Sequence, residues 1–296
     1  MPVLSRPVPL PVRLRPCSAV VLVCFTCLTG CSRPDAAPPA PPGSPASRRA
    51  GGAATIAADT VIPVGPYGDA VRRGRALLLA TRDSLPAHVG NKLRCTSCHL
   101  DAGRRETGTW VGAFARYPQY RARSGVVETI EYRVNDCFRR SMNGTALDPG
   151  GPDMRDIVSY LAFLSRGVSV APPEGPNQRA LKWAGFRADT AAGALVFATT
   201  CVKCHGAGGQ GTDVAPPLWG PGSYNIGAGM SRVRTAAEFI SRNMPFDAPG
   251  TLRDSQAFNV AAYINAHPRP DFSGKENDWP KGDPPSDVAY PTRAHH

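Results

Sequence analysis

The 296-residue chain has no run of lysine and arginine of the kind that binds nucleic acid, although its formal net charge is +11. The arginines are scattered along the sequence and mixed with acidic residues, which disfavours nucleic acid as a partner. The same positive charge suits an acidic membrane surface or a small anionic substrate. The charge pattern therefore disfavours nucleic acid and leaves an acidic membrane or a small anionic substrate as partners.

Long apolar segments and strand patterns are missing as well. No convincing run alternates apolar and polar residues as a half-buried strand does, so the sequence favours an all-α fold. The apolar run near the start, CSAVVLVCFTCLTG, is shorter than the ~20 residues of a membrane-spanning helix. It follows the basic segment MPVLSRPVPLPVRLRP, and this order is typical of an export signal.

The end of this export signal, LTGC at residues 28–31, resembles the bacterial lipobox. In a lipobox the cysteine, here Cys31, is acylated and becomes the first mature residue; an ordinary small-residue cleavage site is the alternative. We therefore predict a lipoprotein-type signal peptide at residues 1–30 and a tether rich in proline and alanine at residues 31–62. These segments predict an exported, periplasmic protein that a lipid on Cys31 anchors to a bacterial membrane.

Most of the nine cysteines fall into recognisable groups, because three belong to the leader and Cys31 ends it. Four more form two CxxCH pentapeptides, which contain Cys95, Cys98 and His99 and, further on, Cys201, Cys204 and His205. CxxCH is the attachment signature of c-type haem, whose vinyl groups react with the two thiols while the histidine coordinates the iron. Because no CxxC outside the leader completes a zinc tetrahedron, we predict two covalently bound haem c groups.

Both pentapeptides lie in a similar helical context, 106 residues apart. Helices are predicted at residues 67–82, 152–167, 190–200, 235–243 and 255–267. Thr235 and Glu238 have the spacing of a capping box, in which two side chains close the start of a helix. The repeated plan predicts that each haem is held by its own small helical domain.

These observations predict two tandem cytochrome c domains, each with one covalently bound haem c. The N-terminal domain covers residues 63–172 and the C-terminal domain residues 173–270, and they are joined near APPEGPNQR at 171–179. The remaining residues, 271–296, are rich in proline and polar side chains. They are predicted to form an extended tail that is packed over the surface or partly free.

A methionine is the expected second axial ligand of the second haem, because methionine raises the potential and suits electron transfer. Met244 follows a predicted helix and precedes Pro245, a position from which a loop can present sulfur to iron. Met230 lies in a glycine-rich loop and is the other candidate. We favour Met244; the alternative for either residue is a methionine that only fills the core.

The first haem has three candidate ligands, Cys137, Met142 and His88. Cys137 is the cysteine that no motif explains, and an odd cysteine in an exported protein is reactive, a ligand, or paired with another chain. Three nearby arginines favour its thiolate form, which suits both iron and nucleophilic attack: Arg133, Arg139 and Arg140. A small buried residue or an intermolecular disulfide remains the other interpretation.

The segments EYRVNDCFRRSMNG, WVGAFARYPQYRARSG and CTSCHLDAG resemble the thiosulfate dehydrogenase family of dihaem c-type cytochromes. SYNIGAGMSRVRTAAEFISRNMPF in the second domain is also similar to that family, and the likeness extends over residues 65–290. In the family the first haem has His/Cys ligation and forms the active site. The second haem has His/Met ligation in at least some members and passes electrons on.

The resemblance implies that His99 and Cys137 are the two axial ligands of the first haem. It also implies that Arg123 and Arg133 line the substrate site, and that Arg140 matches an arginine expected just after the cysteine better than Arg139 does. Two departures stand out. The lipobox and the tether differ from a simple soluble periplasmic member, and ARYPQYRARSG carries one extra Ala-Arg step.

The implied function is the oxidation of two thiosulfate ions to tetrathionate, with electrons passing from the first haem to the second and then to a small c-type cytochrome. Arginine forks suit this chemistry because they bring together two dianions that repel each other. The direction stays open, since the same site could reduce tetrathionate. The alternatives are a dihaem electron-transfer cytochrome without its own substrate, a cytochrome that conjugates thiosulfate to a carrier protein, and a dihaem peroxidase.

Overall fold

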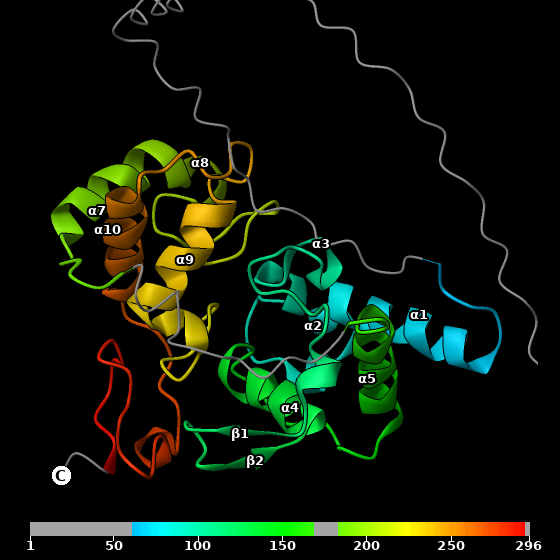
Figure 1. Cartoon of the computed structure of the whole chain (residues 1–296). Helices are drawn as coiled ribbons and strands as arrows, with labels where there is room; N and C mark the ends of the chain where they lie inside the picture. The colour runs from blue at the N-terminus through cyan, green and yellow to red at the C-terminus, as the bar shows by residue number, and fades with distance from the viewer. Residues whose placement is uncertain (1–60, 169–182, 294–296) are drawn as a thin grey trace, which may run out of the picture. The chain divides into compact units, whose positions relative to one another are not determined.

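The computed structural model describes residues 61–168 and 183–293, which belong to one compact unit (Figure 1). Helices predominate in both ranges, and their buried apolar side chains form two separate core clusters. This arrangement agrees with the predicted pair of helical domains. The predicted signal peptide, the tether up to residue 60 and the link at 171–179 lie outside the described residues.

The N-terminal domain contains α1 (Pro66–Leu79), α2 (Thr81–Ser84), α3 (Leu100–Gly103), α4 (Ile130–Arg140) and α5 (Pro152–Leu164). Both α1 and α5 begin with proline, whose missing N–H costs no hydrogen bond at that position. The two helices pack against each other, and Gly74 of α1 faces the backbone of α5. A Cβ at Gly74 would lie 1.9 Å from the carbonyl oxygen of Asp156, so only glycine permits this approach.

The C-terminal domain repeats this plan with α7 (Thr190–Val196), α8 (Val202–His205), α9 (Val233–Asn243) and α10 (Asp254–Asn265). A π-helical turn at Phe197–Cys201 joins α7 to α8. Asp189 caps α7, because its side chain accepts a hydrogen bond of 2.9 Å from the N–H of Ala192. α7 packs on α10, and a Cβ at Gly193 would lie 2.2 Å from the carbonyl oxygen of Asn259. In each domain, therefore, the first and last helices pack closely against each other at a glycine.

The predicted capping box at Thr235 and Glu238 is wrong. Helix α9 begins at Val233, so both residues lie inside it, and no side chain caps its start. Thr235 instead accepts a hydrogen bond of 3.0 Å from Nη2 of Arg232. Thr235 and Glu238 have the spacing of a capping box, but the N-cap of the helix is Arg232, three residues earlier.

The structure also contains a hairpin that the sequence did not predict. Strands β1 (Gln119–Arg121) and β2 (Val126–Glu128) are antiparallel, with Gln119 opposite Glu128. Each strand has three residues, which is too few for an alternating pattern to be recognised. The turn between the strands carries Arg123, so the hairpin presents one of the predicted site residues.

Two buried asparagines connect the domains. The side-chain amide of Asn91 donates hydrogen bonds to the carbonyl oxygens of Ser141 and Ser223, at 2.8 and 3.0 Å. Asn225 lies in the C-terminal domain, and its side-chain amide donates to the carbonyl oxygen of Arg139 at 2.8 Å. Because a buried amide is costly unless its hydrogen bonds are made, these contacts hold the two domains in one arrangement.

Residues 271–293, which we call the C-terminal arm, are packed onto both domains. The N–H of Trp279 donates to the carbonyl oxygen of Arg123 at 2.7 Å, and a carboxylate oxygen of Asp287 accepts from the N–H of Arg234 at 2.9 Å. Trp279 and Tyr290 are both buried. The described arm is thus fastened to the protein, as the first of the two predicted arrangements requires.

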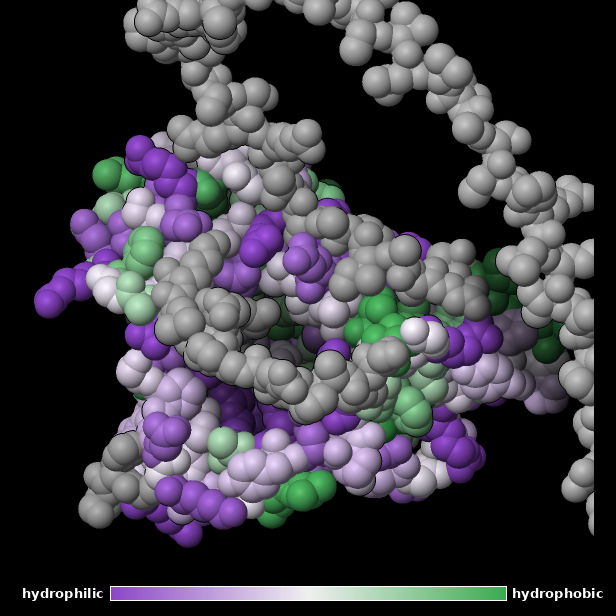
Figure 2. Space-filling view, in the orientation of Figure 1, coloured by the Kyte–Doolittle hydropathy of each residue, from purple (hydrophilic) through white to green (hydrophobic). Residues whose placement is uncertain are grey.

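Polar side chains prevail among the described residues on the face shown in Figure 2. Hydrophilic side chains dominate the visible face, and hydrophobic residues occur there in small separate patches (Figure 2). Among the described residues, no helix combines the length and the apolarity that crossing a membrane requires.

Candidate functional site

Cys137 lies on α4, a helix that the local sequence supports. Thr129 precedes the helix and its hydroxyl oxygen accepts a hydrogen bond from the N–H of Tyr132, at 3.3 Å. Ile130 and Phe138 are buried on the side of the helix that packs on the core. These two residues and Val134 are spaced by four, a helical signal that was present in the sequence but not used.

The thiol of Cys137 has an arginine partner one turn earlier on the same helix. Nη1 of Arg133 donates to Sγ of Cys137 at 3.2 Å, and the same nitrogen is 3.5 Å from a carboxylate oxygen of Asp136. The electrostatic interaction with Cys137 is the largest cause that raises the pKa of Arg133 above its ordinary value. Arg133 therefore stays charged and gives the sulfur a fixed donor.

The two thiols of the first CxxCH interact electrostatically with Cys137. Burial raises the pKa of Cys95 and of Cys98 to about 12, and the charge of Cys137 adds to both shifts. All the cysteines in the described ranges are free thiols, so no disulfide competes for them.

The imidazole of His99 is held in an orientation that suits a metal ligand. Its Nδ1 donates to the carbonyl oxygen of Gly108, and its ring stacks on Trp110 with 4.8 Å between centroids. Burial lowers the pKa of His99 to about 4, so the imidazole is neutral at physiological pH. A neutral ring that is fixed through Nδ1 leaves Nε2 to bind iron.

The other first-haem candidates have different surroundings. Met142 is 3% exposed and belongs to the N-terminal core cluster. His88 has its Nδ1 3.3 Å from the carbonyl oxygen of Thr145 and places its ring edge against Phe138. Of these three candidates, Cys137 is the one whose ligand atom, Sγ, accepts a hydrogen bond from a charged side chain, that of Arg133.

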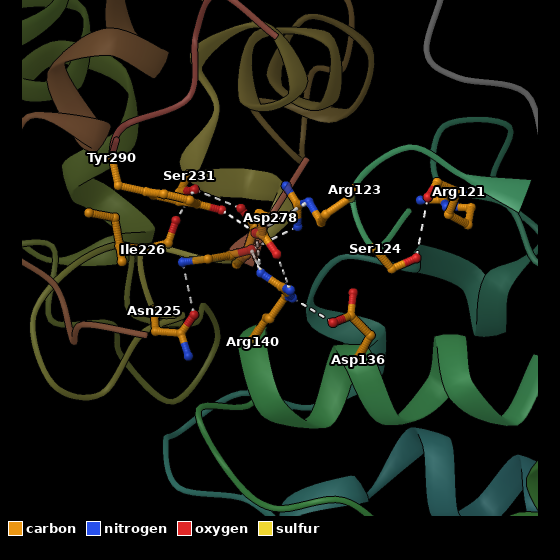
Figure 3. Close-up of polar contacts among 12 residues, drawn as sticks. Arg121, Arg123, Ser124, Asp136, Arg140, Asn225, Ile226, Ser231, Asp278 and Tyr290 are labelled. Carbon is orange, nitrogen blue, oxygen red and sulfur yellow. Dashed lines mark hydrogen bonds and ion pairs between the residues drawn. The ribbon is translucent and has the colours of Figure 1, made fainter. Parts of the chain in front are cut away.

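Arg140 is the centre of a polar cluster (Figure 3). Its Nη1 and Nη2 donate to the two carboxylate oxygens of Asp278 at 2.7 and 2.8 Å, and its Nε donates to Asp136. The ring of Phe272 lies 4.2 Å below the guanidinium carbon. Burial is the largest single influence and lowers the pKa of Arg140, but the two carboxylates together outweigh it and raise the pKa.

Arg123 reaches the same cluster from the hairpin turn. Its Nη1 donates to the carbonyl oxygen of Gly227 at 2.9 Å, and its Nε is 3.9 Å from Asp278. The guanidinium carbon lies 4.8 Å from the centroid of Trp279. Burial, followed by the nearby charge of Arg140, lowers the pKa of Arg123. Arg123 of the N-terminal domain is thus held by Gly227 of the C-terminal domain and by Asp278 and Trp279 of the C-terminal arm.

The structure therefore brings the four predicted site residues into one chain of contacts: Cys137, Arg133, Arg140 and Arg123. Arg139 is outside this chain, with its guanidinium 5.7 Å from the ring of Tyr132. Sequence reasoning missed two carboxylates, Asp136 and Asp278. The first has a helical i, i+4 relation to Arg140 that the sequence contains, whereas nothing local points to the second.

The second CxxCH opens into a cavity of about 470 Å³. Its lining includes both attachment cysteines, His205 and both methionines considered from the sequence, Met230 and Met244. Nδ1 of His205 donates to the carbonyl oxygen of Pro216 at 2.8 Å, and burial lowers the pKa of His205. Cys98 of the first pentapeptide also lines this cavity, so the two predicted haem sites are neighbours.

These donor sets fit haem c. Each site offers two free thiols beside a histidine that is oriented through Nδ1 by a backbone carbonyl, and the second site adds an apolar cavity with methionine sulfur. The contacts do not choose between Met230 and Met244.

Two family models match the chain. Residues 87–170 match "SoxA/TsdA, cytochrome c domain" and residues 188–264 match "Cytochrome C oxidase, cbb3-type, subunit III". Each match contains one CxxCH pentapeptide. Together with the helix-rich structure, they confirm two tandem cytochrome c domains.

Individual proteins are similar over most of the chain. It is 42% identical over 241 residues to a thiosulfate dehydrogenase of Psychrobacter arcticus, covering 78% of this chain and 72% of that protein. It is 41% identical over 239 residues to the protein of the same name from Allochromatium vinosum, covering 76% and 88%. The solved structure of thiosulfate dehydrogenase (TsdBA) from Marichromatium purpuratum, in its "as isolated" form, is 38% identical with a TM-score of 0.66. That match covers 74% of this chain and 51% of the solved chain, so this protein spans about half of it.

Proposed function

Because the chain belongs to the thiosulfate dehydrogenase family, we propose that it oxidises two thiosulfate ions to one tetrathionate ion. The observation that carries this proposal is the donor contact between Arg133 and Sγ of Cys137, which interacts electrostatically with the two thiols of the first CxxCH. A cytochrome that only shuttles electrons has no need of a thiol with a charged donor. The family assignment therefore supports the enzyme over the electron-transfer alternative.

Two covalent haem c groups are part of the proposal. The first would be attached through Cys95 and Cys98, with His99 and Cys137 as axial ligands. The second would be attached through Cys201 and Cys204, with His205 and Met244 as axial ligands. When bound, the two haems would accept the two electrons that leave the substrate. The electrons would then go to an external acceptor such as a small c-type cytochrome.

The arginines supply the substrate contacts in this proposal. Thiosulfate is a dianion, so two of these ions repel each other and need positive charge to approach. Guanidinium groups offer paired N–H donors to sulfonate oxygens in a fixed geometry. Arg133 lies beside the reacting thiol, and Arg123 is fixed at the edge of the same cluster, so both are placed to do this.

Cys137 is proposed to form a transient bond to sulfur. Its thiolate would join the outer sulfur of one thiosulfate in a new S–S bond. This oxidation releases two electrons, and the haems that the CxxCH residues would hold supply the capacity to accept them. The outer sulfur of a second thiosulfate then attacks that thiosulfate sulfur, the bond to Cys137 breaks, and Cys137 returns to the thiolate as tetrathionate leaves. The reverse sequence consumes two electrons, so the same residues would serve tetrathionate reduction.

The test of the function uses the full haem-loaded protein with thiosulfate and ferricyanide. We expect one tetrathionate for every two ferricyanide ions reduced, because each tetrathionate releases two electrons. Haems that are reduced by dithionite but not by thiosulfate would contradict the proposal that the protein oxidises thiosulfate. Assaying tetrathionate with a reduced electron donor would then show whether the reverse reaction takes place.

Replacing the axial methionine should identify it without relying on turnover. We expect Met244→Ala to lose the methionine–iron charge-transfer absorption band of the oxidised second haem, because sulfur would no longer bind the iron. Met230→Ala is the matched control, since both side chains line the same cavity. Loss of the band in Met230→Ala alone would assign the ligand to Met230 instead.

The cellular location is also a proposal, because residues 1–60 lie outside the described structure. We propose that the leader exports the protein and that a lipid on Cys31 anchors it on the periplasmic side of a membrane. Support comes from the LTGC motif and the proline-rich tether. Labelled palmitate should be incorporated by the protein but not by Cys31→Ala, and equal labelling of both would contradict the anchor.

A further inference from the structure

One carboxylate of the C-terminal arm lies inside the arginine cluster. Asp278 is 138 residues from Arg140 in sequence, yet it accepts two hydrogen bonds from that guanidinium. It also accepts a hydrogen bond of 2.6 Å from the hydroxyl of Tyr290 and lies 3.9 Å from Nε of Arg123. Its side chain is only 5% exposed. Figure 3 shows these groups converging on Asp278.

Arg140 is fully engaged by these contacts. Its Nε is bound by Asp136, its two terminal nitrogens by Asp278, and Nη1 also lies 3.4 Å from the carbonyl oxygen of Gly227. Phe272 covers one face of the guanidinium. An arginine that already binds two carboxylates has little left to offer a dianionic substrate.

The other two arginines are less enclosed. The side chain of Arg140 is 11% exposed, whereas those of Arg123 and Arg133 are 17% and 34% exposed. Arg123 has no bidentate carboxylate partner, and Arg133 makes its short contact with sulfur. The cluster thus contains one arginine that is bound by two carboxylates and two whose side chains are more exposed.

We propose that Asp278 is a positioning residue that assigns these roles. It binds Arg140 as a link between α4 and the C-terminal arm, so that Arg140 does not compete for thiosulfate, and its charge holds Arg123 at the edge of the site. The arm is therefore part of the active site, although it follows both haem domains in sequence. This inference rests on the proposed function.

The critical variant is Asp278→Asn, which keeps the shape of the side chain but removes its charge. Two N–H groups of Arg140 then lose their anionic partner and can bind a dianion in an unproductive position. We expect kcat to fall by about tenfold or more, because misplaced substrate reacts slowly. KM should not rise. Sulfate, an unreactive dianion, should inhibit the variant more strongly than the wild type.

Asp271→Asn is the matched control, because Asp271 is exposed on the same arm and accepts its hydrogen bonds from Lys275 and from the N–H of Phe272. It should leave kcat, KM and sulfate inhibition unchanged. If Asp278 only kept the arm folded, Asp278→Asn would raise KM and weaken sulfate inhibition, and that result would overturn the proposal. Unchanged kinetics in Asp278→Asn would overturn it as well.

Tyr290→Phe decides the matter if Asp278→Asn does not accumulate with its haems. It removes one hydrogen bond to Asp278 and leaves every charge in place, so kcat should fall by a smaller factor while sulfate inhibition stays the same. Wild-type kinetics in Tyr290→Phe would then overturn the proposal. An inactive wild-type protein would overturn both the proposed function and this inference, whereas an active wild type with an unaffected Asp278→Asn would overturn the inference alone.

Discussion

Replacing Cys137 with alanine is expected to reduce thiosulfate oxidation by about a thousandfold or more, because the group that bonds to sulfur is removed. The two CxxCH pentapeptides are untouched, so both haems should remain covalently attached. Ferricyanide-linked turnover and the haem content of the purified variant measure the two effects separately. The first haem should also change its absorption spectrum, since an axial thiolate is lost.

Met142→Leu is the control for this prediction. Met142 was the competing ligand in the sequence, and its buried side chain is replaced by one of similar volume. We expect activity and both haem spectra close to those of the wild type. Wild-type activity in Cys137→Ala, or a changed first-haem spectrum in Met142→Leu, would contradict the assignment of Cys137.

Replacing Arg133 with methionine is expected to produce the second largest loss. A hydrogen bond that involves a charged partner contributes about 2 kcal/mol, and we expect kcat/KM to fall by about 30-fold or more because a substrate donor is lost as well. Arg133→Lys should retain part of the activity, since it keeps the charge without the planar fork. Steady-state kinetics with thiosulfate measure both changes.

Arg139→Met provides the matched comparison on the same helix. Arg139 is the arginine that lies over Tyr132, outside the contacts that join Cys137 to Arg123. Its removal changes the net charge by the same amount, so a purely electrostatic role of the arginines predicts equal losses. We expect a change of less than about threefold, which is the range of a partly exposed charge. Equal losses in Arg133→Met and Arg139→Met would contradict the specific role of Arg133.

Local motifs could be predicted well because their residues are neighbours in the chain. The spacing of Cys95, Cys98 and His99 is itself the attachment signal, and its repetition at Cys201 indicated a second domain. Helices α1, α5 and α10 follow the predicted segments, since each is amphipathic over three or more turns. Features of only a few residues were missed or misplaced, such as the hairpin that carries Arg123 and the start of α9.

The amino-acid order alone was enough to predict the two cytochrome c domains, and it contains the two CxxCH pentapeptides and an unassigned cysteine among arginines. These properties depend on spacing over at most a few helical turns. The pairing of Arg140 with Asp278 is instead a property of the tertiary structure. Arg140 and Asp278 are too far apart in the chain for any periodicity to connect them, and their contact exists because the C-terminal arm packs against α4. The sequence shows that Arg140 and Asp278 are present. Whether the charge of Arg140 is neutralised depends on which residues the fold places beside it.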